Sequence, residues 1–413
     1  MKTYTYEKST ALFKRAVKAI PCGVYGHFSP APYVPVDAYP FFAERAKGSR
    51  FWDVDGNEFI DYLCAYGPMV LGYAHPEVDA AFETQWREVD AVSIASPRMI
   101  ELAEMLIDMV PIADWAFFAK NGADVTNLAV MTARAATNRK KIIGIQGGYH
   151  GTTPWMQSPG HHGVMLEDLD NIIRIPWNDV NALKRVIAEH GNDIAGFIST
   201  PYHHPVFTDN ALPAEGYWQQ VVDIMHKNGS LVIVDDVRAG FRLHLGGSCE
   251  KYGFKPDLIC FSKAIANGYA LSALVGTEAL RVDTAKVFHT GSFWFCAGSM
   301  AAAMACLKVL RDMDGPKVME ELGKKLMDGI VEIASNHGYT MKVTGEMSMP
   351  YMRITDDENV MLQQEFCGEC TRRGVFVTSH HNLFLSTAHT EEDIKQTLDI
   401  CDDAFKAVKE KHG

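Results

Sequence analysis

Short apolar runs alternate with longer amphipathic stretches through the middle of the chain. Three further runs resemble 141–145 (KIIGI) in having the length and β-branched character of buried strands: 193–200 (DIAGFIST), 231–237 (LVIVDDV) and 257–262 (DLICFS). The segments 129–138, 181–191 and 217–229 have helical periodicity, and the last two stop at glycine. Buried strands that alternate with helices predict an α/β fold, with a mostly parallel central sheet and helices on both of its faces.

The N-terminal part of the chain has a different pattern. Leu12, Val17 and Ile20 lie at roughly helical spacing and predict a short amphipathic helix. Further on, residues 48–63 place the turn pair Asp55-Gly56 between aromatic and apolar runs, which predicts a β-hairpin. We expect residues 1–65 to form an N-terminal arm and hairpin that belong with a small domain.

The character of the sequence changes again after about residue 300. Two long helices, at 299–313 and 318–338, lead into short strands and a closing helix that begins at Glu391. The expected strands are 341–354 (in two parts), 374–379 and 382–388. The sequence therefore predicts a large domain over 66–300 and a small C-terminal α/β domain over 301–413.

Composition and charge narrow the class of protein. The chain has 413 residues, of which 47% are hydrophobic, so it can bury a large core. Its formal net charge is −12, which argues against nucleic acid as a partner, because that ligand requires a basic face. No segment approaches the ~18 consecutive apolar residues of a membrane helix. Nine scattered cysteines fit a reducing cytoplasm better than a disulfide framework.

Two patterns suggest metal binding, and we expect neither to hold a metal. The histidine pairs at 160–163, 203–205 and 379–382 lack a carboxylate at short spacing, and adjacent histidines point in different directions. The CxxC stretch from Cys367 to Cys370 has no second pair at zinc-like spacing, so we interpret it as part of a packed or solvated helix.

A lysine at the mouth of a buried strand is the first candidate for chemistry. The apolar run 258–261 is followed at once by Ser262 and Lys263. A lysine at the end of a strand often has no chemical role, because the loop that follows is exposed to solvent. A partly desolvated amine in that position can instead form a Schiff base with an aldehyde. The neighbouring motifs decide between these two interpretations.

Asp235 is the second candidate, because it ends the strand at 231–235. A carboxylate there is costly unless a cation or a donor meets it, and a protonated heterocyclic nitrogen would suit. The alternative is that it only caps the following turn. Asp235 and Lys263 would end neighbouring or nearby strands on the same side of the sheet, where ligands of such sheets bind.

Three further motifs point to the same edge. Asn121, Gly122 and Ala123 precede a helical run, and the free N–H groups of its first turn form a phosphate site unless the motif is an ordinary cap. After the strand at 141–145, the glycine-rich stretch 146–151 presents Tyr149 and His150 for stacking on an aromatic ring, unless they only pack in a tight turn. In 288–295 (FHTGSFWF), residue 292 is a serine in a turn before an alanine-rich helix.

These features together are what pyridoxal 5'-phosphate requires: an amine for its aldehyde, a carboxylate for its ring nitrogen, a phosphate cradle and a stacking ring. The chain resembles the class III pyridoxal-phosphate aminotransferases, in their glutamate-1-semialdehyde aminomutase-like branch. The resemblance rests on 52–78 (WDVDGNEFIDYLCAYGPMVLGYAHPEV), 231–242 (LVIVDDVRAGFR), 257–268 (DLICFSKAIANG) and 384–394 (FLSTAHTEEDI). It runs nearly end to end and implies the fold of a fold-type I pyridoxal-phosphate transferase.

The resemblance implies a role for each matching residue. Lys263 would hold the cofactor as a Schiff base and later move protons as the free amine, and Asp235 would keep the ring nitrogen protonated. Val237 would pack under the ring and Tyr149 on its other face. Gly122 and Ala123 would offer N–H groups to the phosphate, with Asn121 beside them. Ser292 would replace a threonine that reaches the phosphate from a neighbouring subunit, so the working unit would be a homodimer with a shared active site.

The chain also departs from the family pattern. Asn121-Gly122-Ala123-Asp124 replaces Ser-Gly-Thr-Glu, and Thr200-Pro201 replaces Glu-Pro, which puts the usual amino donor in doubt. The stretch 21–33 lacks the arginine that several relatives use to hold a carboxylate. Arg238 is an alternative anion partner, unless it faces a surface carboxylate. His27, Tyr66 and His381 lie in segments that match the family in outline and are candidates for the substrate pocket.

The resemblance predicts an aminotransferase that moves an amino group between a small amine or amino acid and a keto acid or aldehyde acceptor. Two alternatives stay open at this stage. An aminomutase or an epimerase would use the same cofactor without net transfer. A non-catalytic α/β binding protein would use Lys263 only to solvate a strand end.

Overall fold

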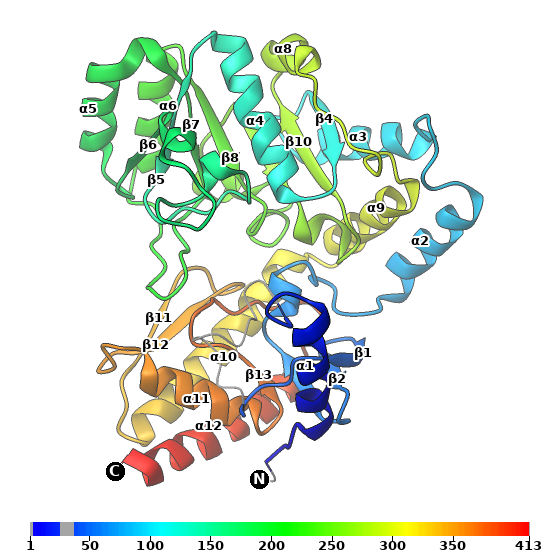
Figure 1. Ribbon diagram of the computed structural model, residues 1–413, viewed down its shortest axis with the longest axis vertical. Coiled ribbons are helices and arrows are strands. Elements are labelled where there is room, and N and C mark those ends of the chain that lie inside the picture. The colour runs from blue at the N-terminus through cyan, green and yellow to red at the C-terminus, as the bar shows by residue number, and fades with distance from the viewer. Residues whose placement is uncertain (1–2, 25–36, 413) are drawn as a thin grey trace. The chain divides into compact units, whose positions relative to one another are not determined.

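A computed structural model describes residues 3–24 and 37–412 of the chain, and it divides into two compact units (Figure 1). The first unit comprises Met1–His75, Val206–Asn210 and Lys317–Gly413, and the second comprises Pro76–Pro205 and Ala211–Pro316. None of the helices in the described ranges is both long and apolar enough to cross a membrane.

The second unit is built on a seven-stranded sheet in the order β4-β10-β9-β8-β7-β5-β6 (Figure 1). The strands are β4 (Trp115–Ala119), β5 (Lys141–Ile145), β6 (Ile172–Ile175), β7 (Ile194–Ser199), β8 (Leu231–Asp235), β9 (Leu258–Phe261) and β10 (Ser272–Gly276). β10 runs antiparallel to both of its neighbours, and the other pairings are parallel. The predicted α/β fold with a mostly parallel sheet is therefore confirmed, and the four strands expected around this sheet are present.

Helices surround the sheet of the second unit. They are α2 (Pro76–Glu88), α3 (Pro97–Met109), α4 (Gly122–Thr137), α5 (Val180–His190), α6 (Tyr217–Lys227), α7 (Ser248–Tyr252), α8 (Arg281–Lys286) and α9 (Ala297–Asp312). Single 3-10 turns occupy 154–156, 166–169, 191–193, 263–266 and 278–280. The apolar face of α4 packs across β7 to β10, where Val125, Leu128 and Ala129 are fully buried. This packing fixes the first turn of α4 relative to the strand ends.

The first unit contains a four-stranded sheet in the order β1-β2-β3-β13. Its strands are β1 (Ala43–Lys47), β2 (Arg50–Asp53), β3 (Glu58–Asp61) and β13 (Val375–Phe376), and a separate pair is formed by β11 (Met341–Thr344) and β12 (Tyr351–Ile354). β2 and β3 are the expected hairpin, and Gly56 in its turn has φ of +87°. A 3-10 turn at 64–66 follows β3.

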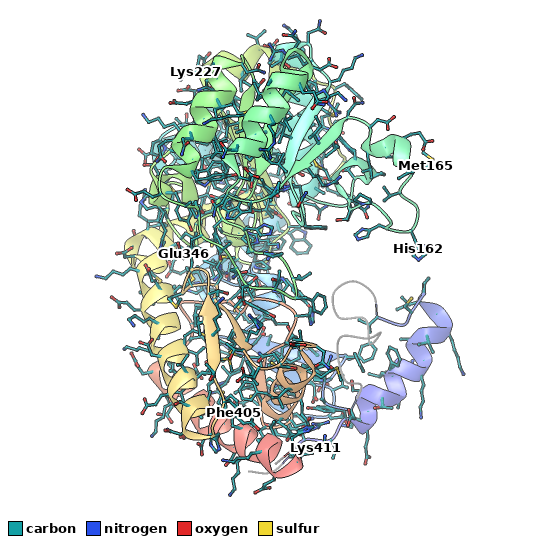
Figure 2. The ribbon with its side chains drawn as sticks, turned by 90° about the vertical axis from the view of Figure 1, so that its left-hand side faces the viewer. His162, Met165, Lys227, Glu346, Phe405 and Lys411 are labelled. Carbon is teal, nitrogen blue, oxygen red and sulfur yellow. The ribbon has the colours of Figure 1, made fainter. Side chains whose placement is uncertain are left out.

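The helices of the first unit are α1 (Glu7–Ala19), α10 (Gly315–Asn336, which enters this unit at Lys317), α11 (Met361–Thr371) and α12 (Glu391–His412). Phe405 projects from α12 (Figure 2), and its ring stacks on Phe366 of α11 with 4.1 Å between centroids. Such aromatic packing buries large apolar areas, and it holds the two helices together.

The main boundaries between the two compact units lie after His75 and after Pro316. The sequence suggested boundaries after residues 65 and 300. α9 explains the position of the later boundary. Its sequence is helical and alanine-rich like the C-terminal part, but it packs against α2 and α3 and so belongs to the second unit.

The predicted N-terminal helix is confirmed as α1, which buries Ser9 and Ala16, while Val17 and Ile20 are exposed. One local expectation, the strand at 382–388, was wrong. The segment 382–388 forms no strand, and its last two residues are in a turn. Its backbone N–H groups donate alternately to Pro350, Tyr62 and Ser348, so no single neighbour supplies a continuous ladder.

Candidate active site

The carboxyl ends of β7, β8 and β9 bring the main sequence candidates to one edge of the second unit. These three strands are adjacent and parallel, so their carboxyl ends lie at the same edge of the sheet. Asp235, the last residue of β8, pairs with Cys260 of β9. Lys263 leaves β9 just beyond this pair. The expected proximity of Asp235 and Lys263 is therefore a direct result of the strand register.

Lys263 begins a 3-10 turn in a backbone conformation that is unfavourable for a non-glycine residue, with φ of +48°. Burial lowers the pKa of its amine to about 7, and the cations Arg238 and Arg242 act in the same direction, while Asp235 opposes them. At neutral pH a large fraction of this amine is therefore uncharged, which an ordinary lysine is not.

Asp235 is only 5% exposed, and both of its carboxylate oxygens have partners. One oxygen lies 2.7 Å from Nδ1 of His150, and the other accepts the backbone N–H of Val237 at 3.2 Å. His150 was expected to stack on an aromatic ring. The ring nitrogen of His150 orients the carboxylate, and stacking of the ring face stays a prediction. The carbonyl of His150 accepts the hydroxyl of Thr126 in α4 at 2.6 Å.

The helix start at Gly122 has the form expected of a phosphate cradle. Gly122 and Ala123 occupy the first turn of α4, where no carbonyl of the helix itself is in reach of their N–H groups. The N–H of Asn121 donates to the side chain of Asp124 at 2.8 Å and so fixes the turn. A Cβ at Gly122 would stand 2.8 Å from a methyl group of Val237, so only glycine allows the helix start to approach the end of β8 so closely.

Tyr149 and Arg238 also lie at this edge. Tyr149 is 55% exposed, and its partial burial together with the charge of Asp235 raises its pKa. Arg238 is partly buried, its Nη1 donates to the carbonyl oxygen of His204 at 3.0 Å, and burial lowers its pKa. Arg238 thus lies in the electrostatic environment of Asp235, Tyr149 and Lys263, as an anion-binding residue would.

Ser292 is in an exposed turn, and His289 of the same segment contacts the Asp124 carbonyl in the first turn of α4 at 3.0 Å. Tyr66 and His381 belong to the first unit, where their rings meet edge to face at 5.3 Å. The candidate His27 lies outside the described residues.

Sequence reasoning missed His204 and Arg242, which contribute to the electrostatics of Lys263 and its surroundings. His204 interacts with both Arg238 and Lys263, and Arg242 lowers the pKa of Lys263. The sequence offered a signal for each: Arg242 ends the motif at 231–242, and His204 follows the departure at Thr200-Pro201. From the sequence alone, the histidine pair at 203–205 suggests only metal binding. Within the described ranges, no three potential ligand side chains form a metal-binding group.

These residues fit pyridoxal 5'-phosphate by their donor set. The amine of Lys263, which is partly uncharged near neutral pH, is available to an aldehyde, and the fixed carboxylate of Asp235 is available to a protonated ring nitrogen. The helix start at Gly122 suits a phosphate. An added Cβ at either Gly122 or Gly151 would crowd this helix start. A Cβ at Gly151 would lie 2.7 Å from the Cβ of Ala123.

Comparison with known proteins agrees with this chemistry. The family model "Aminotransferase class-III" matches residues 33–405. The chain is 40% identical over 397 residues to the aminopentol aminotransferase of Sphingopyxis macrogoltabida, a match that covers 96% of this chain and 93% of that protein. It is 31% identical over 428 residues to the glutamate-1-semialdehyde 2,1-aminomutase of Methanothermobacter thermautotrophicus, covering 97% and 100%.

Among solved structures, the FumI protein of Sphingopyxis sp. MTA144 in its PLP internal aldimine form superimposes with a TM-score of 0.96. The two sequences are 39% identical, and the match covers 98% of this chain and 97% of that one. The chain therefore belongs to the class III aminotransferases. It is a pyridoxal-phosphate-dependent aminotransferase of fold-type I, and it acts on amine and keto substrates.

Proposed function

We propose that Lys263 is the residue that anchors the cofactor and moves the proton in this aminotransferase. The observation that carries the proposal is a buried amine with a pKa of about 7 at the same sheet edge as a carboxylate that a histidine holds at 2.7 Å. A structural strand-end lysine would be solvated and would keep its ordinary pKa.

The other residues of the edge take complementary roles. When bound, pyridoxal phosphate supplies an electron sink for the charge that develops as the substrate loses its Cα proton. Asp235 would hold a proton at the cofactor's ring nitrogen, and His150 keeps the carboxylate in place. Val237 and Tyr149 would pack against the cofactor ring. The first-turn N–H groups of Gly122 and Ala123 would hold its phosphate, next to Asn121.

Lys263 is the group that takes and returns the proton. Near neutral pH its amine exists in both protonation states, so it can act as a base at the substrate carbon and as an acid afterwards. The mutual repulsion between its charged form and Arg238 keeps the base available.

We infer further that two copies of the chain form a homodimer in the reducing environment of a cytoplasm. All nine cysteines are free thiols. The turn that contains Ser292 exposes two large apolar side chains, Phe288 (88% exposed) and Phe293 (66% exposed), which favours burial against a second copy. In such a dimer Ser292 would reach the phosphate of the neighbouring site.

The test of Lys263 uses the purified, cofactor-loaded protein. We expect a visible absorption band that converts on addition of an amine donor, and a covalent adduct at Lys263 after borohydride reduction, found by peptide mass spectrometry. Lys263→Ala should lose the adduct and at least about 10⁴-fold of the turnover. An adduct on another lysine, or full turnover by this variant, would refute the assignment.

An aminomutase activity is the second candidate, because a relative with 31% identity is named as an aminomutase. The two functions differ in their need for an acceptor. We expect one round of conversion of the amine and then a stop when no keto acid or aldehyde is present. Sustained product formation without an acceptor would favour the aminomutase.

A further inference from the structure

Lys120 is a half-buried lysine that the proposed function leaves without a role. It directly follows β4 and precedes Asn121, the residue that caps the start of α4. β4 and β9 both run antiparallel to β10, which lies between them, so their carboxyl ends lie at the same edge of the sheet. Lys120 therefore extends from the sheet edge that also carries Lys263.

The ammonium of Lys120 connects two further elements to the helix start that forms the phosphate cradle. It donates to the carbonyl oxygen of Ala270, in the loop before β10, at 2.8 Å and to the hydroxyl of Ser299, in the first turn of α9, at 3.1 Å. The backbone N–H of Lys120 donates to the side chain of Asp124, a capping residue of α4, at 3.2 Å. An ammonium has three donors, so this one residue joins the cradle, the loop and α9.

The same loop and the same helix also hold the turn that begins at Lys263. Ser262, which directly precedes this turn, donates its hydroxyl to the carbonyl oxygen of Leu271 in the loop at 3.0 Å. α9 packs on the turn, and the thiol of Cys306 donates to a carbonyl oxygen of the turn at 3.4 Å. The backbone of Lys263 has an unfavourable φ of +48°, and such a conformation persists only where surrounding contacts determine it.

A lysine is a costly choice for a purely structural contact in this place. Burial lowers the pKa of its amine, and the nearby Cys296 and Asp90 oppose that shift. In the described part of the chain no carboxylate forms an ion pair with the ammonium, and a partly buried charge without such a partner is unfavourable. Charge-assisted hydrogen bonds to the oxygens of Ala270 and Ser299 offset this cost and fix the two elements more firmly than neutral donors would.

We propose that Lys120 is a positioning residue that keeps the phosphate cradle and the turn of Lys263 at the separation that one cofactor molecule requires. This inference rests on the proposed function of the same site. Each end retains its own chemistry without Lys120, because the amine of Lys263 and the N–H groups of Gly122 and Ala123 belong to other residues. A molecule that carries both an aldehyde and a phosphate gains from two ends that are already correctly spaced, whereas a molecule with only one of these groups does not.

The test applies three probes to the full-length protein after removal of its cofactor: pyridoxal 5'-phosphate, pyridoxal, which has the aldehyde but no phosphate, and inorganic phosphate. The absorption band of the lysine adduct gives the Kd of pyridoxal 5'-phosphate and the rate constant for attachment of pyridoxal. Competition against pyridoxal 5'-phosphate gives the inhibition constant of inorganic phosphate. In Lys120→Met we expect the Kd of pyridoxal 5'-phosphate to rise by about 10–100-fold, and the values for the two partial probes to change by less than about threefold.

Two further variants serve as controls. Lys120→Gln keeps hydrogen-bond donors without the charge, so it should recover part of the lost affinity for pyridoxal 5'-phosphate, and it guards against misfolding of the methionine variant. Lys141→Met is the matched control, because Lys141 begins β5 at the opposite edge of the same sheet and donates only to the carbonyl oxygen of Asp170 at 3.3 Å. It should leave all three values unchanged.

The possible outcomes separate this inference from the proposed function. An unchanged Kd of pyridoxal 5'-phosphate in Lys120→Met would overturn the inference and leave the aminotransferase standing. Equal weakening of all three probes would do the same, because it indicates a general loss of structure, and so would equal weakening of pyridoxal 5'-phosphate and inorganic phosphate, because it indicates an effect of charge alone. If inorganic phosphate does not compete in the wild-type protein, the proposed phosphate cradle and the inference fail together.

Discussion

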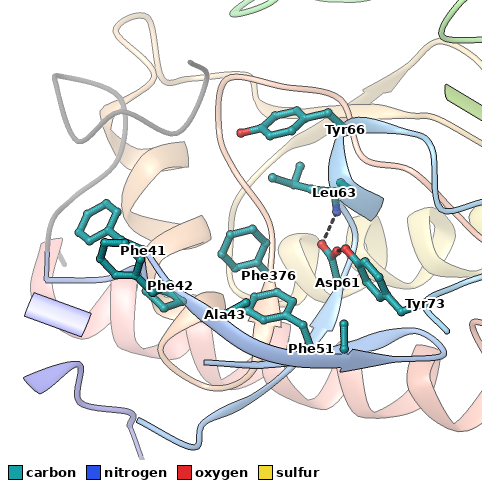
Figure 3. A pocket seen from close by; sticks show the side chains of 12 residues that line it. Phe41, Phe42, Ala43, Phe51, Asp61, Leu63, Tyr66, Tyr73 and Phe376 are labelled. Carbon is teal, nitrogen blue, oxygen red and sulfur yellow. Dashed lines mark hydrogen bonds between the residues drawn. The ribbon is translucent and has the colours of Figure 1, made fainter. Parts of the chain in front are cut away.

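Two buried carboxylates, one in each unit, end strands in nearly the same way and yet have different surroundings. Asp61 is the last residue of β3 and is 3% exposed, and Asp235 is the last residue of β8 and is 5% exposed. The hydroxyl of Tyr73 donates to Asp61 at 2.5 Å, and the N–H of Leu63 donates to it at 2.8 Å (Figure 3). Burial raises the pKa of Asp61, and these neutral donors offset the rise only in part.

Asp61 borders an aromatic pocket of about 240 Å³ that also contains Phe51, Phe376 and Tyr66 (Figure 3). Asp235 shares its surroundings with Lys263 and Arg238, and an imidazole bonds one of its oxygens. A buried carboxylate that is satisfied by neutral donors belongs to the architecture. A buried carboxylate that faces cations and a titratable amine is arranged for chemistry, because its charge shifts the pKa values of those groups.

The largest expected difference is between Asp235→Asn and Asp61→Asn. Asp235→Asn removes the charge that keeps the ring nitrogen protonated, and we expect kcat/KM to fall by about 10²–10³-fold, similar to the loss of one preorganised electrostatic group. Asp61→Asn places an amide against two donors and should cost about 1–3 kcal/mol of stability. Steady-state kinetics and thermal unfolding, measured on both variants, test the comparison.

The cofactor spectrum gives the control for this pair. It should change in Asp235→Asn and stay as in the wild type in Asp61→Asn. If the two variants lost activity equally per folded molecule, with unchanged spectra in both, the distinction between the two carboxylates would be wrong.

Substitutions of the residues that hydrogen-bond to each carboxylate should have smaller effects than substitutions of the carboxylates themselves. His150→Phe leaves Asp235 without its 2.7 Å partner and should lower kcat/KM by about 10–100-fold, as expected when a hydrogen bond to a charged group is lost. Tyr73→Phe removes the corresponding donor from Asp61, and we expect its effect in the melting temperature. Kinetics at saturating cofactor separate a positioning role of His150 from weaker cofactor binding.

His150→Asn provides a check on that interpretation. Asparagine keeps a donor near the carboxylate, and it should recover part of the loss. Equal defects in the phenylalanine and asparagine variants would mean that His150 acts through packing rather than through its bond to Asp235.

The fold could be predicted largely from sequence, because buried strands and amphipathic helices have distinct periods. The apolar run that ends at Asp235 and the run before Lys263 both became neighbouring parallel strands, and their register then placed the two side chains together. The failures have one cause. In 382–388 the apolar character was correct, but a strand also requires a continuous partner, which only the tertiary structure supplies.

The candidate site shows the same limit. The sequence indicated that His150 lies at the site, yet it could not show whether the ring would stack or would bond Asp235, because that depends on the path of the loop held by Thr126. His204 belongs to one of three histidine pairs, and the sequence does not show which of them lies near the site. In the structure its electrostatic interactions with Arg238 and Lys263 set it apart.

The cationic surroundings of Lys263 also predict a pH dependence. Below a pKa of about 7 the amine is protonated and cannot attack an aldehyde, so covalent attachment of the cofactor to the apoprotein should slow by about tenfold for each pH unit below that value. With a lysine of ordinary pKa, the rate of covalent attachment would continue to increase as the pH is raised beyond about 9. Stopped-flow measurements of the absorption band between pH 5.5 and 9.5 test this.

Arg238→Met sharpens this measurement. Removing that cation favours the protonated amine, so the midpoint should move upward, toward the ordinary value for lysine. A midpoint that is the same in both proteins would show that Arg238 does not contribute to the lowered pKa of Lys263.

The smallest effect concerns Asp236, which follows Asp235 directly and yet resembles Asp61. Both of its oxygens accept from Ser248, from the hydroxyl at 2.6 Å and from the N–H at 2.7 Å, and burial raises its pKa to about 7. A carboxyl with a raised pKa stabilises the folded state fully below its unfolded value near 3.8, and this contribution is lost as the pH rises through about 7.

The asparagine in Asp236→Asn does not titrate, so only the wild type loses this contribution as the pH rises from about 4 to about 7. The melting temperature of the variant should therefore rise relative to that of the wild type over this range, and the difference should be constant at higher pH. The expected change is roughly 2–4 °C for each kcal/mol in a unit of this size. Scanning calorimetry at several pH values measures it, and the cofactor spectrum should be unaffected. If the difference in melting temperature between the variant and the wild type does not vary with pH, Asp236 is ionised over the whole measured range. Asp235 and Asp236 would then both carry a buried charge at this edge.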